Sequence, residues 1–233
     1  MNPIEDIYSE HENIDIDTLK NLGPLRPMAG IWEGNKSVDV NPKALGPVRQ
    51  IYVERIELQP IDPQSNGPQL FYGLRYHTHV VKPGEIETYH DQVGYWLWEP
   101  ATKTVIFSLA IPRGQVALAA GHVEADATVF EVSAVRGKTE YGICSTTFLE
   151  QEFRTDSFLL NITVDPGGTW SYSEDTLLML RGTEPFRHTD QNTLSKIGEP
   201  MPNPLACLRT PDAGPRVCHT QINPPREIVR SAD

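Results

Sequence analysis

The sequence predicts an all-β fold, a ten-stranded antiparallel up-and-down barrel with a short N-terminal helix. Between residues 30 and 181 of the 233-residue chain, strand-like runs follow one another with few helical patterns. Short stretches of proline, glycine, asparagine and aspartate separate them and join antiparallel neighbours. So many strands leave unpaired edges unless the sheet closes, which favours a barrel. An immunoglobulin-like sandwich is the alternative, but no Cys, Trp, Cys spacing supports it.

The N-terminal part is expected to lead into the barrel rather than to belong to its wall. Residues 1–15 are charged and weakly apolar, so we expect a mobile leader there. Apolar residues at a spacing of three predict a short helix within 16–28, which could cover one end of the barrel. The first strand begins with GIWEG at 30–34, where glycines flank a large aromatic residue and allow a close backbone approach.

The predicted strands account for most of the remaining chain. We place them near residues 30–40, 48–59, 69–81, 86–98, 104–111, 115–122, 127–135, 145–153, 157–164 and 169–181. A barrel of about eight strands already leaves room for a small ligand, so ten strands predict a cavity that takes a small molecule. The proline-rich stretch 199–233 has no periodicity and is expected to be an irregular tail, which leaves 16–198 as the barrel domain.

Composition excludes several classes of partner. The chain has 20 Lys and Arg against 31 Asp and Glu, a net charge of -11, so a nucleic acid or an anionic membrane surface would be repelled. No apolar segment approaches the roughly 20 residues that span a bilayer, and no signal-peptide pattern opens the chain, so we expect a cytoplasmic protein. The three cysteines have no CxxC spacing, which argues against a disulfide scaffold and structural zinc. A homodimer remains open.

The stretch 170–194 combines a strand with a candidate ligand for a bound group. Alternation places Leu177 and Met179 on the same face of the strand. Pro185 prevents the strand from continuing, and the chain turns to present His188 before a predicted short helix. A histidine at such a corner could ligate a metal, whereas a capping or surface histidine is the plainer reading.

Three further histidines lie in predicted strands. His90 shares a face with Trp96, so it lies in the cavity if that face points inward and in solvent if it does not; both readings stay open. His77 and His79 share a face and could bind a metal, but without a third ligand we interpret them as an exposed strand face.

Other chemistry finds little support in the sequence. There is no GxSxG elbow, no Walker loop, and no GxGxxG motif between a strand and a helix. Paired carboxylates such as Glu54 and Glu57, or Glu150 and Glu152, are most simply interpreted as solvated strand faces. Cys218 with its neighbouring histidine lacks further metal ligands.

Four segments in order resemble the nitrobindin family over roughly residues 19–197. They are LGPLRPMAGIWEG at 22–34, ETYHDQVGYW at 87–96, LAIPRGQVALAAG at 109–121, and the last predicted strand leading into FRHTDQNTL. GIWEG matches the family's GxWxG start, and His90 before Gly94 matches its histidine followed by a glycine-aromatic pair. Met179 matches a cavity methionine, and His188 lies near the position of the axial ligand.

The resemblance implies a fatty-acid-binding-protein-like barrel that holds ferric heme b through one histidine. Family members bind nitric oxide and are credited with isomerising peroxynitrite to nitrate. On this reading His188 is the axial ligand to iron, Leu177 and Met179 line the pocket, and His90 stands near the heme.

Two departures from the family pattern leave alternatives open. His188 is one residue closer to Met179 than the family's spacing between histidine and methionine. The segment after GIWEG lacks the family's further glycine and its YPTI-like sequence. The chain could therefore belong to a branch that keeps the barrel and has lost or altered heme binding. Beside the heme protein, a carrier or sensor of a small apolar ligand is a second hypothesis, and a barrel filled by its own side chains, with an interaction role, is a third.

Overall fold

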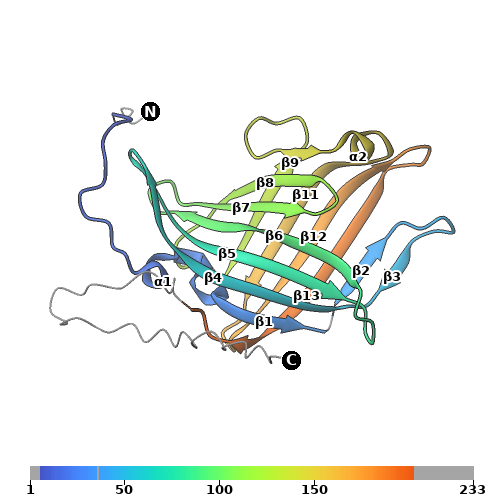
Figure 1. The fold of residues 1–233 in the computed structure, drawn as a ribbon, viewed down its shortest axis with the longest axis horizontal. Coiled ribbons are helices and arrows are strands. Elements are labelled where there is room, and N and C mark those ends of the chain that lie inside the picture. The colour runs from blue at the N-terminus through green and yellow to red at the C-terminus, as the bar shows by residue number, and fades with distance from the viewer. Residues whose placement is uncertain (1–5, 36, 202–233) are drawn as a thin grey trace, which may run out of the picture.

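The computed structural model describes residues 6–35 and 37–201, whose strands form one antiparallel sheet closed into a barrel (Figure 1). Ten strands make the closed wall in the order β1-β4-β5-β6-β7-β8-β9-β11-β12-β13, and β13 pairs back with β1. The prediction of a ten-stranded antiparallel barrel is confirmed. The wall strands are β1 (Gly30–Gly34), β4 (Val53–Asn66), β5 (Gln69–Val81), β6 (Thr88–Glu99), β7 (Thr104–Ile111), β8 (Gln115–His122), β9 (Val129–Val135), β11 (Phe153–Val164), β12 (Thr169–Leu180) and β13 (Phe186–Gly198).

Three short strands lie beside this wall. β2 (Val38–Asn41) pairs with β13 beyond the segment that pairs with β1, and β3 (Val48–Gln50) pairs with β2. The predicted first strand, 30–40, is therefore two strands that share one partner. β10 (Ile143–Ser145) adds to β8. In Figure 1 the β2–β3 hairpin extends from the barrel on the side away from α1.

Two predictions about the late strands are wrong in detail. Residues 145–153 form mainly the helix α2 (Thr147–Glu152), because its leucine, glutamates and glutamine favour a helix and Thr146 enters it in an extended conformation. The segment after Pro185 is β13 and not a helix. Gly182, with φ +79°, turns the chain so that β13 returns beside β12 over Phe186–Ser195. Pairing on both of its edges overrides the polar composition of β13.

The predicted helix within 16–28 is two shorter pieces, α1 (Thr18–Asn21) and the 3₁₀ helix η1 (Gly23–Met28). Proline has no N–H to continue an α-helix, and η1 contains Pro24 and Pro27. Leu22, Leu25 and Met28 are fully buried in the hydrophobic core. The pair of helices therefore packs against one end of the barrel.

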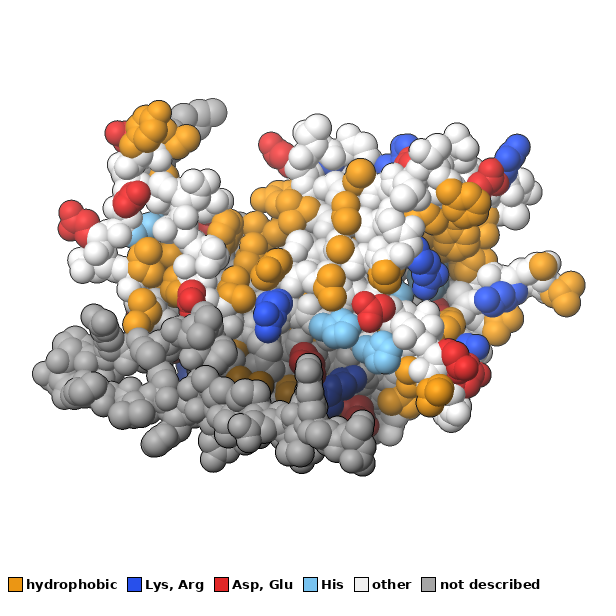
Figure 2. Space-filling model, in the orientation of Figure 1, with side chains coloured by type: hydrophobic (Ala, Val, Ile, Leu, Met, Phe, Trp, Pro, Cys, Tyr) orange, Lys and Arg blue, Asp and Glu red, His pale blue; other side chains and the backbone are white. Residues whose placement is uncertain are grey.

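Stacked aromatic rings line the apolar part of the interior. The Trp96 and Phe107 ring centroids are 4.2 Å apart, and Phe107 also stacks on Tyr76 and Phe158. On the outside, apolar side chains stand among polar ones on the face seen in Figure 2, and Val93, Tyr95 and Leu118 belong to the exposed set. Alternation along each strand thus separates the packed interior from the surface.

In residues 6–35 and 37–201 no helix has the length and apolar character that a membrane crossing needs. Only residues 199–201 of the predicted tail, and residues 6–15 of the predicted leader, are described. The domain boundaries therefore stay predictions.

Candidate functional site

The barrel encloses a cavity of about 560 Å³. This volume falls within the range of roughly 300–1,000 Å³ typical of small-molecule pockets. Its lining comes from the inward-facing residues of most wall strands, together with residues of β2, the loop after β2, and α2. The prediction of a cavity is borne out, and the hypothesis of a barrel filled by its own side chains is wrong.

One part of the cavity wall is apolar. Its members come from the inward faces of β6, β7, β8, β11 and β12, where every second residue points into the barrel. They include Trp96, Phe107, Leu109, Ile111, Ala117, Phe158, Leu160, Ile162 and Leu178. Such a surface suits a flat or extended apolar ligand.

His188 lies on this cavity from within β13, directly opposite Thr176 of β12. Its Nδ1 is 3.0 Å from the backbone oxygen of Val40 in β2. A carbonyl oxygen only accepts hydrogen bonds, so Nδ1 carries the proton and donates to it. The other ring nitrogen, Nε2, then keeps a free lone pair, which is the form in which histidine ligates a metal.

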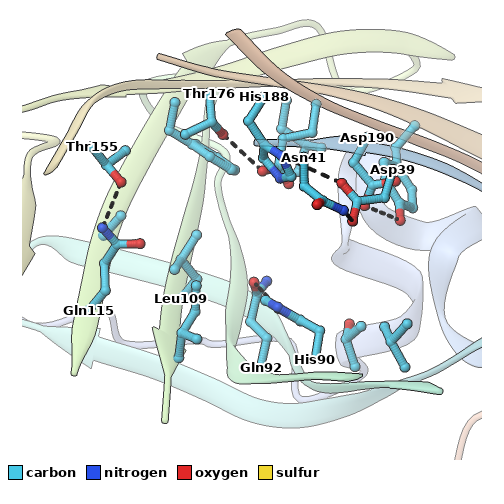
Figure 3. A pocket seen from close by; sticks show the side chains of 18 of the residues that line it. Asp39, Asn41, His90, Gln92, Leu109, Gln115, Thr155, Thr176, His188 and Asp190 are labelled. Atoms are coloured by element: carbon cyan, nitrogen blue, oxygen red, sulfur yellow. Dashed lines mark hydrogen bonds and ion pairs between the residues drawn. The ribbon is translucent and has the colours of Figure 1, made fainter. Parts of the chain in front are cut away.

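His90 lies on the opposite side of the open space from His188 (Figure 3). Its Nε2 is 3.3 Å from Gln92 Oε1, and the Gln92 amide donates to the Tyr76 hydroxyl at 2.8 Å. Burial lowers the pKa of His90, which keeps the ring neutral at pH 7. Of the two readings of its strand face, the inward one is therefore correct.

Leu177 and Met179 do not line the cavity. The residues of β12 that do so are Thr176 and Leu178, which are both buried, whereas Leu177 and Met179 point to the other face of the strand. The structure thus brings His188 and His90 to one cavity and leaves the other two predicted pocket residues outside it.

Four carboxyl groups form a second, acidic part of the cavity wall, which the sequence did not reveal. They are Asp39 of β2, Glu54 of β4, Glu174 of β12 and Asp190 of β13. The interpretation of Glu54 as solvated is wrong, since it is only 3% exposed. The available signal was its alternation with two apolar residues, at 56 and 58, on the inward face of β4.

Tyrosine hydroxyl and amide groups donate hydrogen bonds to carboxyl oxygens of this acidic wall. The Tyr52 hydroxyl donates to Asp190 Oδ1 at 2.5 Å, and the Tyr172 hydroxyl donates to Glu54 Oε2 at 3.0 Å. Asn192 Nδ2 donates to the same Glu54 oxygen at 2.8 Å. These bonds hold the carboxyl groups in fixed positions along the cavity.

Burial changes the charge of the acidic wall. It raises the pKa of Glu54, Glu174 and Asp190 to about 7 each, because a charged carboxylate loses hydration inside the barrel. Neighbouring carboxylates raise each pKa further, and hydrogen bonds to Asn192 and Tyr172 oppose the rise at Glu54. At neutral pH the wall is therefore only partly charged.

The remaining candidates lie outside the cavity. His77 bonds Asp91 at 2.9 Å and His79 bonds Thr88 at 3.1 Å, on the outer face of β5 and β6. This agrees with their interpretation as an outward strand face. Cys218 and its neighbouring histidine fall outside the described residues.

Comparison with known proteins finds similarity over most of the barrel. The family model of the THAP4-like, heme-binding beta-barrel domain matches residues 21–196. Among solved structures, Rv2717c from M. tuberculosis is 19% identical, with a TM-score of 0.55 over 78% of this chain and 99% of that chain. That likeness shows a shared fold. No curated protein matches the chain in sequence.

Proposed function

Because the chain belongs to the THAP4-like, heme-binding β-barrel domain family, the nitrobindin family that its sequence resembles, we propose that it binds ferric heme b in the barrel cavity through His188. The observation that carries the proposal is the imidazole on the cavity wall. Its Nδ1 is engaged by the Val40 carbonyl, which leaves Nε2 as the donor atom for iron.

The cavity lining fits the rest of the group. A porphyrin is flat and largely apolar, and the aromatic wall around Trp96 and Phe107 offers a surface of that kind. Its propionates are anionic, and the two cationic residues on the cavity are Lys43 and Arg113, both exposed at loops next to β2 and β7. We propose that these two side chains receive the propionates at the mouth.

The activity we propose is the binding of nitric oxide and the isomerisation of peroxynitrite to nitrate. Bound ferric heme supplies a Lewis-acidic iron for these small ligands. The protein contributes a dry apolar wall and the neutral ring of His90. Since its Nε2 is bonded to Gln92, His90 keeps Nδ1 as a hydrogen-bond acceptor, and its ring lies across the cavity from His188.

Titration with hemin tests this function. The native protein is expected to give one tight ferric complex with a Soret band, and His188→Ala is expected to lose it, because it removes the nitrogen that we propose binds iron. His77→Ala, which removes an exposed histidine from the outer face, is the matched control and is expected to bind as the native protein does. A full Soret band in folded His188→Ala, or none in the native protein, contradicts the proposal.

The cavity volume and its apolar wall also support a second candidate, the carriage of a small apolar ligand without heme. The acidic wall would repel a fatty-acid carboxylate, so a neutral ligand would be selected. Native mass spectrometry of the purified protein separates the two candidates: a retained neutral lipid and no response to hemin would favour the carrier.

Two broader expectations also remain proposals. We propose a cytoplasmic protein, on the acidic composition and the reduced cysteines that the sequence suggests, and a homodimer as its assembly. Cell fractionation tests the first, and light scattering during gel filtration tests the second.

A further inference from the structure

We propose that Asp39 is a positioning residue for the iron ligand: its carboxylate stands beside the Nδ1–H group of His188, which the Val40 carbonyl accepts, and its charge strengthens Nε2 as a donor. The inference rests on the proposed heme function. It assigns a role to a residue of β2, a short strand beside the closed wall.

The pairing of β2 with β13 brings the two residues together. Asp39 lies opposite Asp190, and Val40 lies opposite Thr189, so this short pairing flanks His188. Asp39 Oδ1 is 3.4 Å from His188 Nδ1. The same nitrogen is 3.0 Å from the Val40 oxygen, to which it donates, so the Asp39 carboxylate stands beside an N–H group that is already bonded. Asp39 and His188 are both labelled in Figure 3.

The carboxylate is fixed through its other oxygen. Asp39 Oδ2 accepts the Tyr89 hydroxyl at 2.6 Å and the Asn41 amide at 2.9 Å. Oδ1 is buried and has no hydrogen-bond partner of its own. A buried acceptor left without a donor is unfavourable, and the His188 imidazole, 3.4 Å away at Nδ1, offers Oδ1 a polar neighbour.

The carboxylate beside Nδ1 affects the basicity of Nε2, the other ring nitrogen of His188. A carboxylate beside the N–H group of a ligating histidine holds the ring in place and raises the basicity of the coordinating nitrogen. A more basic ligand favours ferric over ferrous iron, since the higher charge gains more from it. Asp39 thus biases the site towards tight binding of ferric heme.

Asp39→Asn tests the role, because it removes the charge and keeps the size of the side chain. The affinity for hemin is expected to fall about 10- to 100-fold. If ferrous affinity falls about tenfold less than ferric affinity, the midpoint potential rises by about 59 mV. The iron–histidine stretching frequency of the ferrous complex, read by resonance Raman spectroscopy, is expected to fall.

Glu54→Gln is the matched control. It also neutralises a buried carboxyl on the acidic wall, but Glu54 is bonded to Tyr172 and Asn192 and not to His188. Its iron–histidine stretching frequency is expected to stay at the native value, because that frequency reports the bonding of the axial ring and not the charge of the distant wall. If Asp39→Asn matches this control while His188→Ala still abolishes binding, the role of Asp39 is overturned and the heme function stands. Failure of the native protein to bind heme overturns both.

The native protein supplies a second readout that needs no variant to fold. Its iron–histidine stretching frequency is expected to lie in the range of heme proteins whose axial histidine is bonded to a carboxylate. A frequency in the lower range of proteins whose histidine is bonded only to a backbone carbonyl overturns the inference.

Discussion

At the scale of single residues, the buried carboxyl groups govern how stability depends on pH. Glu54 and Glu174 have folded-state pKa values of about 7, against 4.5 for a free glutamate. A raised folded-state pKa means that the folded protein binds more protons than the unfolded chain does. The stability that each protonated carboxyl group contributes is therefore complete below pH 4.5 and is lost as pH rises through 7.

We therefore expect the free energy of unfolding of the heme-free protein to fall between pH 5 and pH 8. Glu54→Gln, which cannot ionise, is expected to reduce this fall by on the order of 1–3 kcal/mol, since each pKa unit corresponds to about 1.4 kcal/mol. Urea unfolding at the two pH values measures it. An equal fall in Glu54→Gln, or a rise in stability with pH in the native protein, contradicts the assignment.

The sequence located some of these residues and not others. His188 could be found from its place after the last recognisable strand, although its partner Val40 lies 148 residues away and no spacing predicts that contact. Asp39 alternates with Val38 and Val40, as a solvent-facing strand residue would, and Asp190 stands among polar residues. Neither burial could be predicted, because it is decided by which strand lies alongside. Leu177 and Met179 were expected in the pocket on the resemblance alone, which does not say which face of this strand points into the barrel.

At the scale of elements, the bounds of regular hairpin strands could be predicted better than the type of the less regular elements. The hairpin strands β5 to β8 follow alternation and short turns, and their bounds lie close to the predicted ones. α2 and β13 could not be predicted, since the first is a single helical stretch of six residues and the second has few apolar residues. Contacts distant in sequence stabilise both.

One motif glycine has a clear reason at this scale. Gly94 of β6 lies so close to β7 that a Cβ atom there would stand 2.0 Å from the Ser108 backbone oxygen. Any side chain at this position would push the two strands apart. The glycine of the HDQVGYW segment therefore serves the barrel wall, while His90 of the same segment serves the cavity.

The helical segment at the barrel end is expected to contribute stability without contributing to the site. Leu25 of η1 is fully buried and does not line the cavity. Leu25→Ala is expected to lower the free energy of unfolding by about 2–5 kcal/mol through the void it leaves. Hemin affinity at a temperature where the variant is folded is expected to stay native.

Ile86→Ala is the control for this change, because Ile86 is 92% exposed and its loss leaves no void. Urea unfolding and hemin titration of the two variants measure both effects. A large loss of hemin affinity in folded Leu25→Ala would mean that the end segment shapes the site.

At the scale of the whole molecule, closure of the barrel explains why strands from its beginning and its end meet at one cavity. β13 pairs with β12 along the chain and with β1 and β2 from the beginning of it. The axial candidate and its carbonyl partner therefore come together only when the barrel closes. The sequence predicts closure because an open sheet of so many strands would have unpaired edges, but it does not predict which side chains meet where the sheet closes.

The central claim is that His188 holds iron inside this barrel, and the position of iron in crystals of the hemin complex tests it most directly. Anomalous diffraction at the iron edge is expected to place one iron within bonding distance of His188 Nε2, in the cavity between β13 and β6. Iron bonded instead to His90, or to a histidine on the outer face of β5, would contradict the account.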